Sequence, residues 1–337
     1  MTKESRQTPQ FDFIALGDIV TDAFIRLKEA EIHADIQKSE RKICMNFGDK
    51  IPYESVTVVP AVGNSPNASV SASRLGLKSA LVTNLGDDIE GDRALEQLKD
   101  DNVSTVFARK HREMKTNYHY VLWYQDDRTI LIKHEEYPYT LPNIGEPKWL
   151  YLSSLGSHSL PFHHTIADYL EAHPKIRLVF QPGTFQIQQG TEKLSRLYAQ
   201  TEVFFCNTDE ARRLLKTQST DILTLLRGLQ EHGPKIVVIT DGAKGAYAYY
   251  ESEAWFMPPY PDPKAPVDRT GAGDSFASTF TSALVGGKTV PEALTWAPIN
   301  SMSVVQQIGA QKGLLTREKL EDFLAKAPPE YKLKILV

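Results

Sequence analysis

The sequence predicts an α/β protein in which a doubly wound, mainly parallel sheet is flanked by helices and carries a small β-sheet lid. The first observation is a repeated order of short apolar runs followed by segments with helical periodicity, which is typical of strands buried on both faces. The second is that glycine, asparagine or aspartate directly follows several of these runs. The third is a pair of zones, residues 24–60 and 103–137, in which apolar and polar residues alternate, as in strands that are covered on one face only.

The chain is predicted to begin with a buried strand and a helix of small residues. Phe11 to Leu16 is an apolar run that Gly17-Asp18 closes, so we expect a strand there. Asn64-Ser65-Pro66-Asn67 then opens a helix, with Ser65 or Asn64 as its N-cap and Pro66 at its first position. Each of these two elements places polar residues at one of its ends.

The remaining core elements follow the same alternation. The further expected strands are residues 80–83, 149–152, 176–180, 203–206 and 236–239. The further expected helices are residues 90–101, 162–172, 190–200, 208–216 and 219–231. Ligands of open parallel sheets bind beyond the carboxyl ends of the strands. We therefore expect the polar residues that follow these strands to meet at one edge of the sheet.

The two alternating zones are best joined into one small β layer that projects from the main sheet. Asn117 to Tyr124 is rich in aromatic and β-branched residues, a composition that favours strand. No linker, repeat or low-complexity tract interrupts the chain. We expect a single domain over residues 1–337, with a lid formed by about 24–60 and 103–137 that is inserted in the α/β core.

Composition excludes some classes of function. The chain has 337 residues with a net charge of −4, so there is no electrostatic case for nucleic acid or an anionic membrane. No run approaches the roughly 18 apolar residues that a membrane helix requires, and Met1 to Gln7 lacks the apolar core of a signal peptide. Cys44 and Cys206 each lie in an apolar stretch and are expected to be small buried hydrophobes in a reducing compartment. We expect a cytoplasmic protein.

One segment combines an anion site with a carboxylate. Gly271-Ala272-Gly273 runs into a helix in which Phe276, Phe280 and Leu284 recur every four residues. The first amides of a helix lack intrahelical partners and carry partial positive charge, which suits a phosphate or another developing anion. Asp274 lies among them. It is either a base that takes a proton while the amides hold the charge, or an ordinary residue at a helix start.

The segment from Asp268 to Asp274 resembles the signature D-T-x-G-A-G-D of the PfkB (ribokinase-like) family of carbohydrate and nucleoside kinases. Other segments resemble that family in the same order along the chain. They are Gly17-Asp18 with Asp22, Gly63 to Asn67, Gly86 to Gly91, Asn207 to Glu210, Thr240 to Gly245, and Gly309-Ala310. The resemblance covers roughly residues 11–325 and implies a ribokinase-like fold.

The resemblance implies an ATP-dependent kinase that phosphorylates a primary hydroxyl of a sugar. Asp274 would accept the proton of that hydroxyl, while the amides of Gly271, Ala272 and Gly273 stabilise the transferred phosphoryl group. The residues implied to bind the substrate are Asp18, Asp22, Gly63, Asn64 and Asn67. The residues implied to contact the nucleotide are Asn207, Thr240, Gly242, Gly245, Thr270 and Asn300.

The resemblance also implies cofactors and partners. Asn207 and Glu210 would act on Mg²⁺ through water, although by themselves they resemble a helix cap with a glutamate at the third helical position. ATP and Mg²⁺ are therefore expected. K⁺ is left open, because some relatives use a monovalent ion near the anion-binding turn and this sequence shows no site for it. A homodimer paired through the lid is a further hypothesis.

Departures from the family pattern keep the substrate open. Val62 or Asn64 takes the place of one of two adjacent glycines, Arg269 stands where Thr is common, and Gln181-Pro182-Gly183 falls where Asp or Asn is frequent. A nucleoside (adenosine-type) kinase is the alternative to a sugar kinase. A non-catalytic sugar- or nucleotide-binding regulator is the alternative from a different class. A nicotinamide-dependent oxidoreductase is disfavoured, since the chain has no G-x-G-x-x-G fingerprint.

Overall fold

Short, fully buried runs of apolar residues form the central sheet of the protein. A computed structural model describes residues 10–35, 40–125 and 127–337. Within them the main sheet has the strand order β16-β15-β14-β13-β12-β11-β10-β1-β6-β7. Its strands are β1 (Phe13–Leu16), β6 (Ser79–Gly86), β7 (Ala108–His111), β10 (Trp149–Leu152), β11 (Arg177–Phe180), β12 (Thr201–Asn207), β13 (Ile236–Thr240), β14 (Ala246–Tyr250), β15 (Glu253–Met257) and β16 (Lys334–Ile335).

The main sheet is largely parallel, as the sequence predicts. All neighbours from β7 through β13 pair in parallel. Only β13 to β16 pair antiparallel, at one edge. The parallel strands therefore present their carboxyl ends along one rim of the sheet, which is where α/β proteins of this kind bind ligands.

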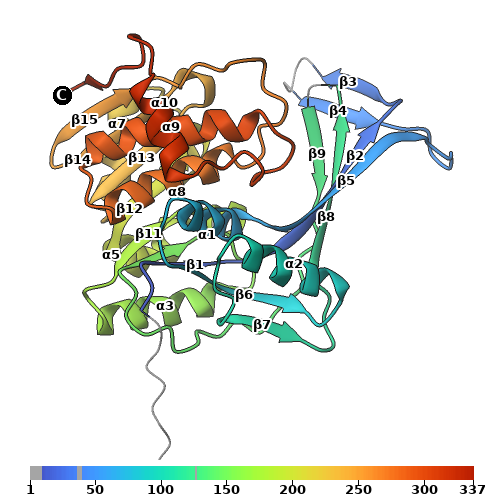
Figure 1. Ribbon diagram of the computed structural model, residues 1–337, viewed down its shortest axis with the longest axis horizontal. Coiled ribbons are helices and arrows are strands. Elements are labelled where there is room, and N and C mark those ends of the chain that lie inside the picture. The colour runs from blue at the N-terminus through green and yellow to red at the C-terminus, as the bar shows by residue number, and fades with distance from the viewer. Residues whose placement is uncertain (1–9, 36–39, 126) are drawn as a thin grey trace, which may run out of the picture.

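Helices cover both faces of this sheet (Figure 1). They are α1 (Asn64–Arg74), α2 (Ile89–Asp100), α3 (Leu160–Ala172), α4 (Thr184–Lys193), α5 (Ser195–Gln200), α6 (Thr208–Leu214), α7 (Ile222–Gln230), η1 (Gly242–Lys244), α8 (Ala272–Val285), α9 (Val290–Val305) and α10 (Arg317–Ala325). Alternate residues of β1 belong to different cores: Phe13 and Ala15 join the cluster with α1, α8 and α9, and Ile14 and Leu16 the cluster with α3, α5 and α7. This alternation is the signature of a strand that is covered on both faces.

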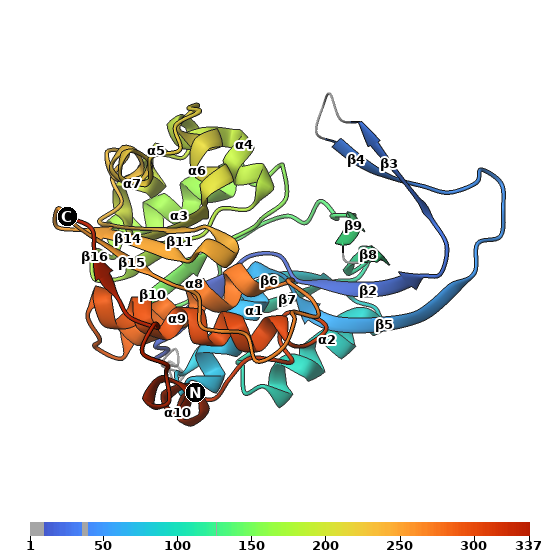
Figure 2. The same cartoon turned by 90° about the horizontal axis from the view of Figure 1, so that it is seen from above.

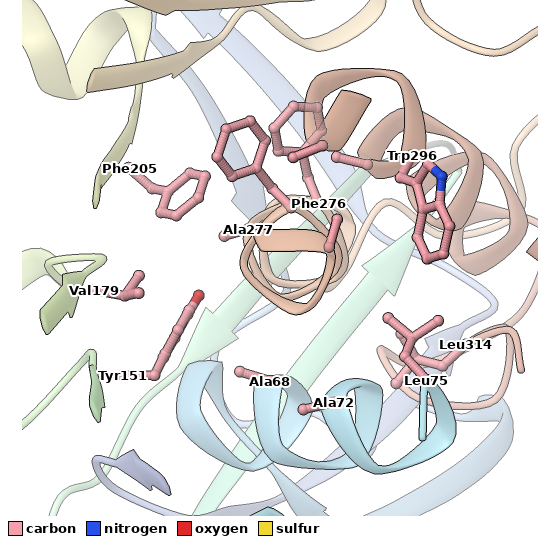
Figure 3. Packing of buried hydrophobic residues seen from close by; sticks show 14 of the residues in the cluster. Ala68, Ala72, Leu75, Tyr151, Val179, Phe205, Phe276, Ala277, Trp296 and Leu314 are labelled. Atoms are coloured by element: carbon pink, nitrogen blue, oxygen red, sulfur yellow. The ribbon is translucent and has the colours of Figure 1, made fainter. Parts of the chain in front are cut away.

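The packing of α1 against α8 positions the site. Figure 3 shows Ala68 and Ala72 of α1 facing α8, with Phe276 and Ala277 on α8 and Phe205 of β12 alongside. Small side chains allow the two helices to approach closely. The start of α1 is thereby brought beside the start of α8.

Two helix boundaries differ from the prediction. The cap of α1 is Gly63 and not Ser65 or Asn64, because the Asn64 side chain donates to Asp274. Pro66 consequently lies within the first turn and not at the first position. The helix predicted over residues 190–200 is interrupted: Gly190 is non-helical within α4, with φ +78°, and Leu194 separates the end of α4 from α5.

A second, four-stranded sheet with the order β5-β2-β8-β9 stands away from the main body (Figures 1 and 2). Its strands are β2 (Val20–Leu27), β5 (Tyr53–Val62), β8 (Asn117–Tyr124) and β9 (Asp127–Leu131), next to the hairpin of β3 (Glu31–Asp35) and β4 (Glu40–Cys44). The predicted small β layer therefore exists. The second predicted lid zone, residues 103–137, includes too much of the chain, because β7 within it belongs to the main sheet. Residues 36–39 and 126 of the two zones lie outside the described residues.

Two smaller expectations can be compared with the structure. Cys206 is buried and Cys44 only partly buried, both as free thiols, so the buried environment predicted for Cys44 was wrong. Cys44 ends a strand of the β3–β4 hairpin, which the main core does not cover. Among the described residues, no helix has both the length and the apolar character needed to cross a membrane.

Candidate active site

The start of α8 has the geometry of an anion-binding turn. Gly271 is the N-cap of the helix and adopts the left-handed conformation, with φ +76°. A Cβ atom at this position would lie 2.3 Å from Cβ of Ala310, so only glycine fits there. The following amides point out of the helix start, although that of Ala272 already makes a long bond of 3.4 Å to the carbonyl of Arg269. The turn therefore offers donors and partial positive charge to an anion.

Three side-chain amides hold the carboxylate of Asp274. Asn64 Nδ2 donates to Oδ1 at 2.7 Å, and Asn67 Nδ2 donates to Oδ2 at 2.8 Å. Gln181 Nε2 completes the set with a bond to Oδ1 at 3.2 Å. Asn64 and Asn67 lie in the first turn of α1, whereas Gln181 directly follows β11. The side chain of Asp274 is thus held in a fixed orientation by neutral donors.

Burial and hydrogen bonding act in opposite directions on Asp274. Its burial raises the pKa of the carboxyl above the ordinary value of 3.8, while the bonds from Asn67, Asn64 and Gln181 lower it. The effect of burial is larger than that of the three hydrogen bonds, so the pKa of Asp274 stays above its ordinary value. A carboxylate with a raised pKa is a better proton acceptor than an exposed aspartate. The environment is therefore suited to a general base.

A second layer of contacts orients these amides. Gln311 Nε2 donates to Asn67 Oδ1 at 3.0 Å and to the Ala61 carbonyl at 2.7 Å. The Tyr151 hydroxyl donates to Gln181 Oε1. With their oxygens occupied, the amides of Asn67 and Gln181 present NH₂ groups to Asp274. The network is polar and buried, and its connected donors and acceptors restrict its movement.

The predicted substrate segment lies next to this carboxylate. Asp18 follows β1, and a Cβ at Gly63 would lie 2.8 Å from the Asp18 carbonyl oxygen, so the two segments touch. Both carboxylate oxygens of Asp18 accept from the Tyr139 hydroxyl at 2.9 Å. Asp22 lies on β2 and is also buried. Asn64 and Asn67, predicted to bind substrate, use their NH₂ groups on Asp274.

The predicted nucleotide turn lines a pocket at the same helix start. A cavity of about 270 Å³ is bordered by Thr240, Gly242 and Gly245 as well as by Ala272 and Gly273. Its remaining walls include the apolar side chains of Phe276, Met302 and Val305. The turn after β13 and the start of α8 thus share one pocket, with an apolar wall suited to a flat ring and polar backbone suited to phosphates.

A larger cavity of about 540 Å³ lies elsewhere. It is lined by Trp149, Arg177 and Glu202, which stand at the amino-terminal ends of their strands. None of the predicted site residues borders it. It lies at the rim opposite to the anion-binding turn and is not part of the site.

Two predicted nucleotide contacts are placed differently by the structure. Asn300 is completely buried; it donates to Thr279 Oγ1 at 2.7 Å and accepts from the Leu315 amide at 2.9 Å. It holds α8, α9 and the segment before α10 together, and we do not retain it as a nucleotide contact. Thr270 directs both its amide and its hydroxyl to Asp268 Oδ1, at 2.9 and 2.7 Å.

Asn207 and Glu210 form a capping box. Asn207 Oδ1 accepts from the Glu210 amide at 2.9 Å, and Glu210 Oε2 accepts from the Asn207 amide at 2.8 Å. Burial raises the pKa of Glu210, the hydrogen bond from Asn207 lowers it, and the nearby charge of Asp274 raises it. Asn207 and Glu210 therefore do cap the helix. The carboxylate of Glu210 is also close enough to Asp274 for the charge of Asp274 to raise its pKa.

This donor set fits a magnesium ion held through water. Mg²⁺ prefers oxygen ligands and usually takes only one or two carboxylates. No cluster of three or more His, Cys, Asp or Glu that could hold a metal occurs within residues 10–35, 40–125 and 127–337. Arg213 lowers the pKa of Glu210 and the charge of Asp274 raises it, so a divalent cation would reduce the remaining repulsion between the two carboxylates.

Comparison with known proteins identifies the family. The family model described as pfkB family carbohydrate kinase matches residues 30–317. The chain belongs to this family. It is a carbohydrate kinase, a phosphotransferase with an alcohol group as acceptor, as the signature from Asp268 to Asp274 implies.

Curated relatives of this carbohydrate kinase carry different names. It is 26% identical to the 5-dehydro-2-deoxygluconokinase of Halalkalibacterium halodurans over 97% of this chain and 98% of that protein. It is 28% identical to the ribokinase of Bacillus subtilis, over 82% and 92% of the two chains. It is 26% identical to the nucleoside kinase of Methanothermobacter thermautotrophicus, over 78% and 84%.

Solved structures share the fold of this kinase. A ribokinase of Arabidopsis thaliana complexed with ribose and ATP superimposes with a TM-score of 0.79 at 18% identity, covering 94% of this chain and 99% of that one. An E. coli chain assigned as a ribokinase II, in complex with ATP and Mg²⁺, gives a TM-score of 0.72 at 17% identity with the same coverage. The ribokinase-like fold, with its mainly parallel sheet and separate small sheet, is therefore confirmed.

Sequence reasoning missed several side chains of this kinase site. Gln181 was noted only as a departure from the family, although its place after a strand was a usable signal. Tyr139 and Tyr151 gave no local signal, since their hydroxyls are directed to Asp18 and Gln181 by the tertiary fold.

Proposed function

We propose that this kinase transfers the γ-phosphoryl group of ATP to a primary hydroxyl of a sugar, with Asp274 as the general base. The observation that carries the proposal is the juxtaposition of a buried carboxylate with an anion-binding helix start that borders a pocket for a nucleotide. The ribokinase complexed with ribose and ATP, and the ATP and Mg²⁺ complex of the E. coli chain, support this assignment of the two substrates.

The proposed reaction is an in-line displacement. The sugar hydroxyl oxygen forms a bond to the γ-phosphorus, the bond to the oxygen bridging the β- and γ-phosphorus breaks, and ADP leaves. The hydroxyl proton passes to Asp274. The amides at Gly271, Ala272 and Gly273 donate to the transferred oxygens, and one such donor is typically worth about 3–4 kcal/mol. Thr240, Gly242 and Gly245 would contact the nucleotide, with Thr270 orienting the turn through Asp268.

Mg²⁺ would be held through water by Asn207 and Glu210. When bound, it neutralises charge on the phosphates. Asp274 takes the proton, and Asn64 and Asn67 hold the side chain of Asp274 in position. Asp18, Asp22 and Gly63 form the wall of the acceptor site. K⁺ is a further cofactor to be tested, through activity with and without potassium.

A single assay tests the proposal. We expect wild-type protein to release ADP with members of a panel of pentoses, hexoses, sugar phosphates and nucleosides. Asp274→Asn should lower kcat by at least about 1,000-fold, since base and charge are both lost, while ATP binding by calorimetry is retained. Turnover close to wild type in this variant would exclude Asp274 as the base.

The same panel decides between the alternatives. Preference for nucleosides would support the nucleoside kinase, a name that one relative bears. The absence of ADP release with every acceptor would support a sugar- or nucleotide-binding regulator. The amide-lined Asp274 and the ordered turn at Gly271 favour catalysis over that regulator.

We further propose that the chain folds as a single domain and that the lid sheet covers the site and excludes water during transfer. A second copy of the chain is the proposed partner of the lid. We also propose a cytoplasmic location, which the two free thiols support.

A further inference from the structure

Two histidines, His119 and His134, lie between the lid and the substrate segment. The proposed phosphoryl transfer gives neither of them a role. His119 on β8 is paired in register with Asp22 on β2, so the two side chains share one face of the lid sheet. Their Nδ1 and Oδ1 atoms lie 3.4 Å apart. His134 follows β9, and its Nδ1 lies 3.5 Å from Asp18 Oδ2. The ring centres of His119 and His134 are 5.2 Å apart.

Polar atoms in this cluster lack hydrogen-bond partners although they are buried. One of these atoms is Nε2 of His119. The other two are Oδ1 of Asp22 and Nδ1 of His134, whose ion-pair contacts at 3.4 and 3.5 Å do not have the geometry of hydrogen bonds. Asp22 is only 8% exposed, so its free oxygen cannot be satisfied by bulk water. A buried polar group without a partner costs free energy. Three such atoms gathered in one place indicate that a polar ligand completes them.

Two contacts join the cluster to segments that also carry the residues holding Asp274. The ring of His134 packs edge-on against Phe185, with centres 5.8 Å apart, and Phe185 lies in the first turn of α4, shortly after the Gln181 that donates to Asp274. Asp18 touches Gly63, the cap of the helix that carries Asn67. The unpartnered atoms therefore lie on the lid side of the acceptor site.

The chemistry of the cluster selects hydroxyl groups. A carboxylate accepts only, whereas each neutral imidazole has one donor and one acceptor nitrogen. A hydroxyl donates and accepts, so neighbouring hydroxyls of a polyol can satisfy Asp22 and both rings together. A carboxylate of the acceptor would lie beside Asp18 and Asp22, two acceptor-only groups that already face the ring nitrogens of His134 and His119 at 3.5 and 3.4 Å. It would compete with them for the same donors, and it would be repelled wherever they are ionised.

We propose that His119 and His134, together with Asp22, determine specificity by binding adjacent hydroxyls of a neutral polyhydroxylated acceptor and by disfavouring a sugar acid. The inference rests on the proposed sugar kinase function. It distinguishes this chain from the relatives named 5-dehydro-2-deoxygluconokinase, whose name denotes an acid as acceptor.

The test compares an aldose with its aldonate. Because the aldonate also lacks the sugar ring, the corresponding alditol serves as a neutral open-chain control. We expect wild-type kcat/KM to favour the neutral member at least about tenfold. His119→Asn and His134→Asn should each raise KM for the neutral acceptor about tenfold, the equivalent of one lost hydrogen bond, with KM for ATP changed less than about twofold. His164→Asn, at an exposed position on α3, is the matched control and should behave as wild type.

A further variant separates charge repulsion from simple loss of fit. Asp22→Asn should reduce the preference for the neutral acceptor over its acid, because the repulsion is removed while a hydrogen-bonding group remains. Preference of the wild type for the aldonate would overturn the inference. Equal effects of the histidine variants on KM for ATP and KM for the acceptor would also overturn it.

Calorimetry keeps this inference distinguishable from the proposed function. If no acceptor supports ADP release, the kinase reaction fails, but binding of the aldose and the aldonate to wild type and to His119→Asn can still be compared. Binding of the aldose that weakens in the variant would support the histidine site by itself. Binding that is unchanged would reject it.

Discussion

At the scale of single residues, the environment of Asp274 decides what the site can do. The carboxylate is buried, and the side chains that donate to it within the described part of the chain are all neutral amides. A cationic neighbour would lower its pKa and weaken it as a base. Amides instead hold its geometry while leaving the pKa raised. The residue is thus fixed in position and still able to accept a proton.

The pH dependence of activity follows from this balance. The bond from Asn67 lowers the pKa of Asp274, so Asn67→Leu removes a stabilising donor and should raise that pKa. We expect the acid limb of the kcat profile to move to higher pH, and kcat at neutral pH to fall about tenfold or more because the side chain is also less well held. The check is a pH–rate profile from pH 5 to 8. An acid limb that moves to lower pH would contradict this account.

The raised pKa of Asp274 should make the folded protein less stable as pH increases. The folded pKa of Asp274 lies above the ordinary value of 3.8, so the folded state binds more protons than the unfolded state between these two values. The free energy of unfolding therefore falls as pH rises through that window and remains lower above it. Asp274→Asn removes the titrating group, although its single acceptor oxygen cannot receive all three amide donors. We therefore expect Tm of the wild type to fall relative to that of the variant as pH rises through this window. A difference in Tm that does not change with pH would contradict this account.

At the scale of elements, an ion pair ties the lid to the anion-binding turn. Arg128 of β9 is paired with Asp268, whose Oδ1 also accepts from Thr270 and whose Oδ2 accepts from the Gly309 amide at 2.9 Å. The side chain of Asp268 is only 3% exposed. One buried carboxylate therefore joins the lid, the turn before α8 and the segment after α9.

Removing that ion pair should loosen the lid and the turn together. We expect Arg128→Met to lower kcat/KM about tenfold or more, since it leaves a buried charge with fewer partners, and to increase hydrogen exchange in β9 and at residues 268–273. Arg196→Met removes an exposed arginine from surface ion pairs with Asp168 and Glu171 and serves as control. Unchanged exchange in β9 would show that the pair does not hold the lid.

At the scale of the whole molecule, the lid presents an apolar outer face. Ala23 on β2 is paired with Val58 on β5 and Tyr120 on β8, and Tyr120 with Leu131 on β9, so these side chains lie on the face opposite to Asp22 and His119. Val58, Tyr120 and Leu131 are exposed by 43%, 48% and 51%. An exposed apolar row across a sheet is typical of a contact surface.

The proposed lid-to-lid homodimer makes a direct prediction. Solution scattering should give twice the mass of one chain, and Val58→Glu should give monomers whose circular dichroism and Tm are close to wild type. Lys216→Glu, a change of charge at an exposed residue after α6 and outside the lid, is the control. Finding the wild type as a monomer would reject the dimer.

The sequence by itself determined the elements and the class of chemistry. The apolar runs, the helical periodicity and the glycines at Gly271 and Gly273 are visible in the sequence, because the period of a strand or helix depends on neighbouring residues. The signature from Asp268 to Asp274 was sufficient to indicate a phosphoryl-transfer site. The family and the fold were predictable for that reason.

The tertiary structure alone decided which side chains meet. Asn64 and Gln181 reach Asp274 across 210 and 93 positions of sequence, and His119 faces Asp22 only because β2 and β8 pair in a particular register. It also showed that Asn300 is used in packing. No local pattern encodes such contacts, because they arise from the packing of α1 on α8 and from the pairing of distant strands. The identity of the acceptor depends on those contacts, and the motifs alone left it open.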